Sequence, residues 1–65
     1  MLSIKERVDS LQTFLRRSKD SNPSAFEFFS LMTSVPVTRI EEINSGSLPT
    51  VPELIELEVM IGFQS

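Results

Sequence analysis

Residues 29–46, FSLMTSVPVTRIEEINSG, contain two short stretches of apolar residues at helical spacing, separated by a few residues around Pro36. Because a proline disfavours helical geometry in the residue before it, the first stretch is expected to end as a helix near Ser34. The second stretch predicts a helix from residue 36 or 37 to about 45. Gly46 follows it, and glycine takes the left-handed conformation that ends many helices at the lowest cost. Two short helices joined by a tight turn are the expected centre of the fold.

Capping patterns indicate helix starts on both sides of this segment. Ser3 with Glu6 three residues later is a capping box, in which each side chain bonds a backbone N–H at the start of a helix. Thr50 with Glu53 repeats the box and predicts a last helix that ends at Gly62. The chain therefore begins and ends with predicted helices.

The first helix is expected over residues 3–18, and the second follows Pro23. Either Ser24 and Glu27 form another box, or Asn22 caps the helix with Pro23 in its first turn. No alternating strand pattern occurs, so the fold class is all-α, with four short helices in one domain spanning residues 1–65. The apolar residues expected on the buried faces are Ile4, Val8, Leu11, Phe14, Leu15, Ala25, Phe28, Phe29, Met32, Ile40, Ile43, Leu54, Leu57 and Ile61, with Phe26 and Leu31 beside them.

Composition excludes several kinds of chemistry. The 65 residues contain no Cys, His, Trp or Tyr, which removes zinc ribbons, thiol nucleophiles and Ser-His-Asp catalysis. We expect no enzyme activity, no metal and no cofactor. No apolar run approaches the length that spans a bilayer, and the cysteine-free chain is expected to be cytoplasmic. A chain this short has a small core, so self-association as a homodimer is expected.

Charge is distributed unevenly along the chain. Residues 1–19 carry five basic and two acidic side chains, for a net +3. Residues 20–65 carry one basic side chain, Arg39, and seven acidic ones, for a net −6. The two parts are expected to form unlike surfaces, of which only the first suits an anion.

Several short motifs occur together in one order and spacing. They are LQTFLRR at 11–17, Phe29-Ser30, Val35, Ile40 with Ile43, Asn44-Ser45-Gly46, Pro49, Leu54-Ile55-Glu56-Leu57 and Ile61-Gly62-Phe63. Together they resemble the helix-turn-helix domain of Cro and phage repressors, the XRE-like family. The resemblance covers nearly the whole chain and implies a lambda-repressor-like DNA-binding domain, a compact all-α bundle of four or five short helices.

The chain departs from the family pattern in and around the turn. Ala25-Phe26 stand where the family commonly has Thr-Gln, whose glutamine contacts phosphate. Ser34 replaces the turn glycine, so this residue either takes a strained backbone or the turn has another shape. Pro36 stands where serine is usual, and Glu58 where a small buried residue is usual. No sequence is left for the family's fifth helix.

The resemblance implies that the start of the third helix enters the major groove of operator DNA. Arg39 would pair with guanine, and Val37 would contact a thymine methyl group. The full set of candidate DNA-contacting residues is Arg16, Arg17, Lys19, Val37, Thr38, Arg39, Glu42 and Ser47. Because so few cations would meet phosphate, binding is expected to need a dimer. The expected dimer surface is Met60, Ile61 and Phe63, left partly uncovered by the missing helix.

Each of these residues has a simpler structural interpretation. Basic residues at the end of the first helix favour its macrodipole without DNA. Arg39 can pair with Glu41 or Glu42 on one exposed helix face. Glu53, Glu56 and Glu58 are expected to be solvated surface charges or charges in the first turn of a helix. Two functions therefore remain open: a small dimeric transcriptional regulator, or an acidic helix-turn-helix scaffold that binds another protein, as an anti-regulator or antitoxin does.

Overall fold

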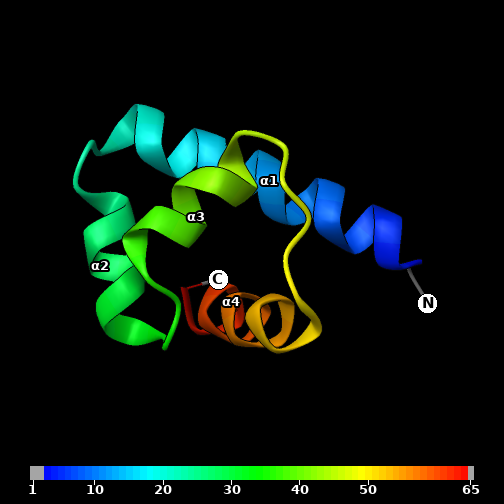
Figure 1. Ribbon diagram of the computed structural model, residues 1–65. Helices are drawn as coiled ribbons and strands as arrows, with labels where there is room; N and C mark the ends of the chain where they lie inside the picture. The colour runs from blue at the N-terminus through cyan, green and yellow to red at the C-terminus, as the bar shows by residue number, and fades with distance from the viewer. Residues whose placement is uncertain (1–2, 65) are drawn as a thin grey trace.

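The computed structural model describes residues 3–64, with side chains described up to Gly62, and this part of the chain folds into four helices. They are α1 (Ile4–Ser21), α2 (Ala25–Met32), α3 (Val37–Asn44) and α4 (Val51–Gln64). Figure 1 shows α1 along one side of the molecule and α4 along the opposite side. Helix α2 closes one end, and α3 lies between α1 and α4. The predicted all-α class is confirmed for the described residues.

Both predicted capping boxes are present. At the start of α1, the Ser3 side chain accepts a hydrogen bond from the Glu6 N–H, and the Glu6 carboxylate accepts one from the Ser3 N–H. Thr50 and Glu53 make the same reciprocal pair before α4, at 2.9 and 3.3 Å. Local sequence therefore sets the start of both long helices.

Two predicted helix ends are wrong. Helix α1 continues to Ser21, because Pro23 constrains only the residue before it, and Asn22 is the extended C-cap. Helix α4 continues past Gly62 to Gln64. Glycine in a helix costs about 1 kcal/mol relative to alanine, which does not by itself end a helix.

Neither predicted cap of α2 forms in full. Ser24 occupies the N-cap position but makes no side-chain capping bond. The Asn22 side chain instead accepts the Ser24 N–H at 3.0 Å, inside the turn that precedes the helix. This arrangement is an Asx turn, which orients the chain before α2 without capping it.

The turn between α2 and α3 has a shape that needs no glycine. Helix α2 ends at Met32, and Thr33 takes an extended conformation. The Thr33 hydroxyl donates to the Phe29 carbonyl at 2.9 Å and accepts the Val35 N–H at 3.1 Å. Among the described residues only Gly46 has a positive φ, so Ser34 is unstrained. Of the two outcomes expected at Ser34, a strained backbone or a turn of another shape, the structure therefore excludes the strained backbone.

Helix α3 ends in a glycine motif, as predicted. Gly46 has φ of 118°, its N–H bonds the Ile43 carbonyl, and the Ser47 N–H bonds the Glu42 carbonyl. These two bonds define a Schellman motif. The side chain of Gln12, on α1, donates a further bond to the Ile43 carbonyl at 3.1 Å. The end of α3 is thereby tied to α1.

A single apolar core fills the space between the helices. Its buried members are Val8, Leu11, Leu15, Ala25, Phe26, Phe29, Val35, Ile40, Ile43, Leu54, Leu57 and Met60. The predicted buried face of α2 is wrong in part, because Phe26 is buried whereas Phe28 and Met32 are exposed. Ile4, expected on the buried stripe of α1, is also exposed.

Candidate interaction surfaces

Arg39 is the best-connected side chain on the surface. Its Nε and Nη2 donate to the two carboxylate oxygens of Glu53 at 3.0 and 2.9 Å. Its Nη1 donates to Glu42 at 2.9 Å, and Nη2 also reaches the Leu48 carbonyl at 3.3 Å. The guanidinium is therefore bound on three sides, with 31% of its side chain exposed.

This network changes the titration of its members. The hydrogen bonds from Arg39, together with the Thr50 N–H, lower the pKa of Glu53 from 4.5 to about 2. The hydrogen bonds to Glu53 and Glu42 raise the pKa of Arg39 above its ordinary value. Glu53 lies in the first turn of α4, which is one of the two places expected for it, and its side chain is 17% exposed. The two hydrogen bonds between Arg39 and Glu53 join α3 to the capped start of α4.

The outward side chains of α3 include two carboxylates. Thr38 and Glu41 are exposed, Glu42 is exposed while paired with Arg39, and Val37 is half-buried against the core. Ser47 is exposed in the loop after α3. Of the basic groups, only Arg39 belongs to this helix, and both its pairs are with acidic residues. The simpler interpretation of Arg39, pairing with Glu42, is borne out and extends to Glu53.

The basic end of α1 differs from α3. Arg16, Arg17 and Lys19 are all exposed. Lys19 lies over the Phe26 ring, with Nζ 5.3 Å from its centroid, a cation–π contact between α1 and α2. None of the described ion pairs includes Arg16 or Arg17. With Lys5, which is also exposed and outside the described ion pairs, these two guanidinium groups are open to an anion.

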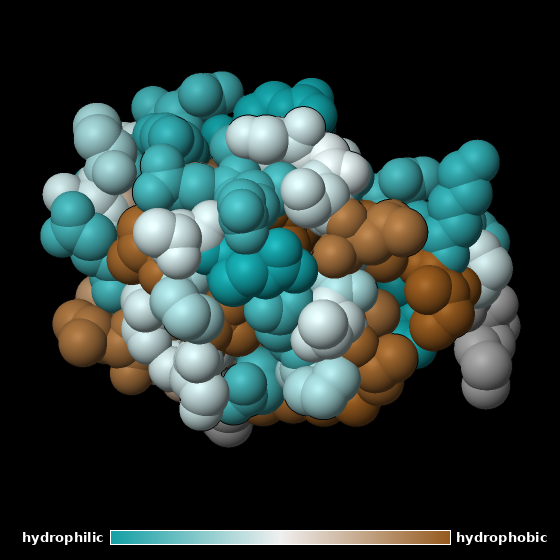
Figure 2. Space-filling view, in the orientation of Figure 1, coloured by the Kyte–Doolittle hydropathy of each residue, from teal (hydrophilic) through white to brown (hydrophobic). Residues whose placement is uncertain are grey.

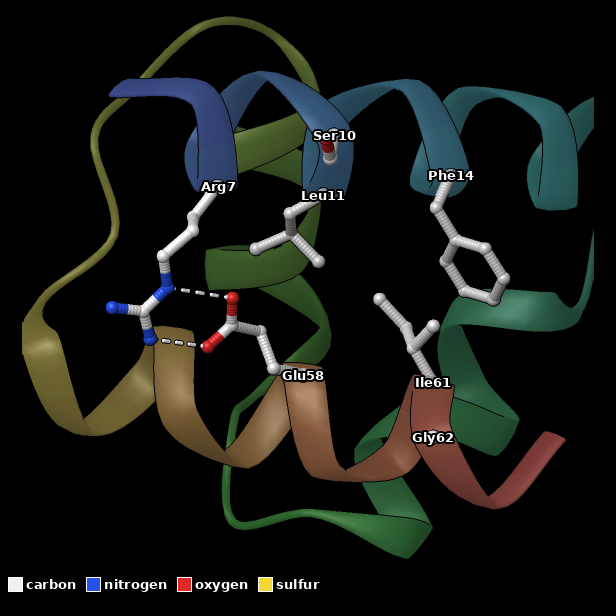
Figure 3. Close-up of a pocket in the computed structure, with 7 residues that line it drawn as sticks. All are labelled: Arg7, Ser10, Leu11, Phe14, Glu58, Ile61 and Gly62. Carbon is white, nitrogen blue, oxygen red and sulfur yellow. Dashed lines mark hydrogen bonds and ion pairs between the residues drawn. The ribbon is translucent and has the colours of Figure 1, made fainter. Parts of the chain in front are cut away.

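A third ion pair joins α1 to α4. Arg7 donates from Nε and Nη2 to the two oxygens of Glu58, at 2.9 and 2.5 Å (Figure 3). These bonds raise the pKa of Arg7 and lower that of Glu58. Glu58 was expected to be a solvated or first-turn charge, and it is neither, because it lies in the middle of α4 and two thirds of its side chain is covered.

A groove of about 320 Å³ lies beside this pair, between α1 and α4. Figure 3 shows the Arg7–Glu58 pair at one end and the Phe14 ring with Ile61 at the other. The walls are mainly apolar. The polar lining of the groove consists of Arg7, Ser10 and Glu58.

The predicted dimer surface is wrong in part, because one of its residues is buried. Met60 is 2% exposed and belongs to the core, so the expectation that it lies uncovered is wrong. Ile61 is half-buried and packs against the core. The side chain of Phe63 lies outside the described residues. Helical geometry explains the error, because Met60 follows Leu57 by three residues on the same face of α4.

A different apolar surface is exposed on α2 and α4. Phe28, Leu31 and Met32 are exposed on α2, with Leu31 at 85%, and Ile55 and Val59 are exposed on α4. A groove of about 200 Å³ lies between the two sets, lined by Met32, Thr33, Ile55, Glu56, Val59 and Met60. We call these five exposed residues and this groove the α2–α4 face. Figure 2 shows hydrophobic areas at the α2 end of the molecule, along its lower edge near α4, and on the right beside the loop after α3 and the start of α1, while the area over α3 is mainly hydrophilic.

The sequence contained a signal for this face that its interpretation missed. The α2 segment AFEFFSLM is apolar at six of its eight positions, which is more than one buried stripe accommodates. A short helix packed on one side must then expose some of its apolar residues. Phe28, Leu31 and Met32 follow the spacing i, i+3, i+4, so they share one outward face.

Among residues 3–64, no helix is long and apolar enough to cross a membrane, and no cluster of residues suits a metal ion. Comparison with known proteins finds no matching family model, no matching curated protein and no matching solved structure.

Proposed function

We propose that this chain is a protein-binding module, built on a helix-turn-helix scaffold of the Cro and phage-repressor kind, whose partner contacts the α2–α4 face. The exposure of that face carries the proposal. Monomeric proteins rarely expose contiguous apolar surface of more than a few hundred Å², and larger patches mark interaction sites. Leu31 is 85% exposed beside a groove lined by Met32, Ile55 and Val59. Methionine at such a surface adapts to the shape of a partner.

The pairing of Arg39 on α3 supports the same proposal. In a DNA-reading helix the arginine would project toward base edges, whereas Arg39 is bound by Glu53, Glu42 and the Leu48 carbonyl. To reach a base it would have to leave two carboxylates, one of them held in the capping box of α4. Glu41 and Glu42 would then lie next to phosphates and repel them.

Capture from the organism that encodes the chain tests this proposal. The tagged chain is incubated with nuclease-treated extract, alongside Leu31→Glu and the double variant Arg16→Ala/Arg17→Ala. We expect a specific protein to be retained by the wild type and by the double variant, and lost with Leu31→Glu. Circular dichroism verifies that all three proteins fold. A retained protein that is indifferent to Leu31→Glu would contradict the proposal.

A dimeric transcriptional regulator is the second candidate, and one observation favours it. Arg16 and Arg17 are exposed at the end of α1, outside the described ion pairs. With Lys19 and Ser47 they would hold phosphates, while Thr38 and a released Arg39 would contact bases. A dimer of this kind would touch roughly six to eight phosphates, which predicts a slope of log K against log salt of about −6.

Fluorescence anisotropy with a random-sequence duplex library, at low and physiological salt, distinguishes the two candidates. The protein-binding module predicts weak binding, lost at physiological salt and insensitive to Arg39→Ala. The regulator predicts selection of a specific sequence and loss of that selection in Arg39→Ala. Loss of binding in Arg16→Ala/Arg17→Ala alone would show nonspecific contact with phosphate.

A further inference from the structure

The charges around the α2–α4 face limit the kind of partner that fits it. Neither α2 nor α4 contains a lysine or an arginine. Glu53 and Glu58 of α4 are neutralised by Arg39 and Arg7. Glu56 lines the groove, and Glu27 precedes Leu31 by four residues, which places these two side chains on the same side of α2. None of the described ion pairs includes Glu27 or Glu56, so the apolar face is flanked by carboxylates that a partner can neutralise.

We propose that the α2–α4 face binds a basic amphipathic helix of a partner protein. This inference rests on the proposed function as a protein-binding module and names the chemistry of its partner. An amphipathic helix that lies in a groove presents apolar anchors at i, i+3 or i+4, and i+7. Lysine or arginine beside those anchors would meet Glu56 and Glu27.

The shape of the face fits one helix. The groove lies between two helices, with the end of α2 on one side and the middle of α4 on the other. Ile55 and Val59 are one turn apart along α4, a spacing of about 6 Å. Two turns of a partner helix, about 11 Å, are therefore long enough to contact both residues.

A second copy of the chain is a poorer fit to the same face. In a two-fold dimer the same patch meets itself, which would bring Glu56 and Glu27 of two subunits, each with a net charge of −3, close together. Contact between the α2–α4 face of one copy and the basic end of α1 of another is also a poor fit. Arg16 and Arg17 carry charge, but the exposed large apolar residue of α1 is Ile4, at the opposite end of the helix.

Two matched peptides test the charge requirement. One is a designed amphipathic helix with leucine anchors and flanking lysines, and the other has glutamates in place of every lysine. Titration of the isotope-labelled full chain is followed by backbone amide shifts. We expect the lysine peptide to bind at least about tenfold more tightly, equivalent to about 1.4 kcal/mol, with shifts in α2 and α4. Equal affinities, or shifts confined to α1 and α3, would overturn the inference.

Charge exchange on the chain supplies the matched control. The double variant Glu27→Lys/Glu56→Lys should reverse the preference and bind the glutamate peptide more tightly. Leu31→Glu should abolish binding of either peptide, and Arg16→Ala/Arg17→Ala should change neither affinity. An unchanged preference in the double lysine variant would overturn the role of these carboxylates.

Sedimentation at several protein concentrations tests whether a second copy of the chain occupies the α2–α4 face instead. We expect a monomer, whereas a dimer that Leu31→Glu dissociates would place a second copy on the face and overturn the inference. The proposed function can hold even if this inference fails. If capture of a partner depends on Leu31 but the two peptides bind equally, only the charge of the partner is wrong. If capture does not depend on Leu31, the proposed function itself fails.

Discussion

The surface over α3 and the α2–α4 face differ in how completely their side chains are already engaged. Over α3, Arg39 makes four hydrogen bonds to α4, to the loop before it and to its own helix. On the α2–α4 face, the large apolar side chains of Leu31, Ile55 and Val59 are exposed to solvent. A side chain whose hydrogen bonds are already made within the fold gains little free energy from contact with a partner. Burial of exposed apolar surface is favourable by about 25 cal/mol per Å². The difference favours the α2–α4 face as the site of binding.

The largest expected effect separates the two sides of α4. Leu57 is fully buried, whereas Ile55 is 49% exposed. Leu57→Ala should cost about 2–5 kcal/mol in the free energy of unfolding, because it leaves a cavity in the core. Ile55→Ala should change that free energy by about 0.5 kcal/mol or less, as surface substitutions do. Urea denaturation of both variants is the measurement, and a cost at Ile55 as large as that at Leu57 would mean that the face is part of the core.

The two glycines should respond in opposite directions to alanine. Gly46 has φ of 118°, so Gly46→Ala should destabilise the chain by about 1–2 kcal/mol through backbone strain at the end of α3. Gly62 lies within α4 with open space around it, so Gly62→Ala should stabilise by about 0.4–1 kcal/mol. Thermal unfolding compares the two variants. A neutral Gly46→Ala would show that the loop after α3 tolerates another shape, and that Arg39 is less firmly held.

Acid should weaken the contact between α3 and α4. The pKa of Glu53 falls from 4.5 to about 2 on folding, so its contribution to stability is complete above about pH 4.5. That contribution is lost as pH falls toward 2, because the unfolded state then binds the proton more readily. The melting temperature of the wild type should therefore approach that of Glu53→Gln between pH 4.5 and 2. Glu41→Gln, which removes an exposed carboxylate of α3 and leaves the Arg39 contact with Glu53 in place, is the control for the loss of one negative charge.

The smallest expected effect is the difference in melting temperature between variants of two arginines. Arg39→Ala should lower the melting temperature by a few degrees, since it removes a two-pronged contact with Glu53. Arg39→Lys should recover only part of the loss, because an ammonium group cannot reproduce the planar fork. Arg16→Ala, at an exposed position outside the described ion pairs, should leave the melting temperature unchanged. Equal effects at the two positions would mean that the Arg39 network does not persist in solution.

The elements of the fold follow from local sequence signals. Capping boxes at Ser3 and Thr50 and the glycine motif at Gly46 act within a few residues, and the structure confirms all three. The helix ends near residues 18 and 62 were wrong, because neither Pro23 nor Gly62 acts as strongly as assumed.

The candidate site was harder to predict because its contacts join distant residues. Glu53 is 14 residues from Arg39, and Glu58 is 51 residues from Arg7. Nothing in the spacing along a single helix indicates either pair. The burial of Met60 could have been expected from its spacing to Leu57. The exposure of Phe28 could not, because it depends on how α2 is rotated against the core, which helical periodicity leaves open when six of eight positions are apolar.

Amide shift mapping of the isotope-labelled full chain, bound to the partner captured with it, tests the central claim most directly. The α2–α4 face predicts the largest shifts at Leu31, Ile55 and Val59, with Arg39 unaffected. Shifts concentrated at Arg16, Thr38 and Arg39, with α2 and α4 unchanged, would contradict it.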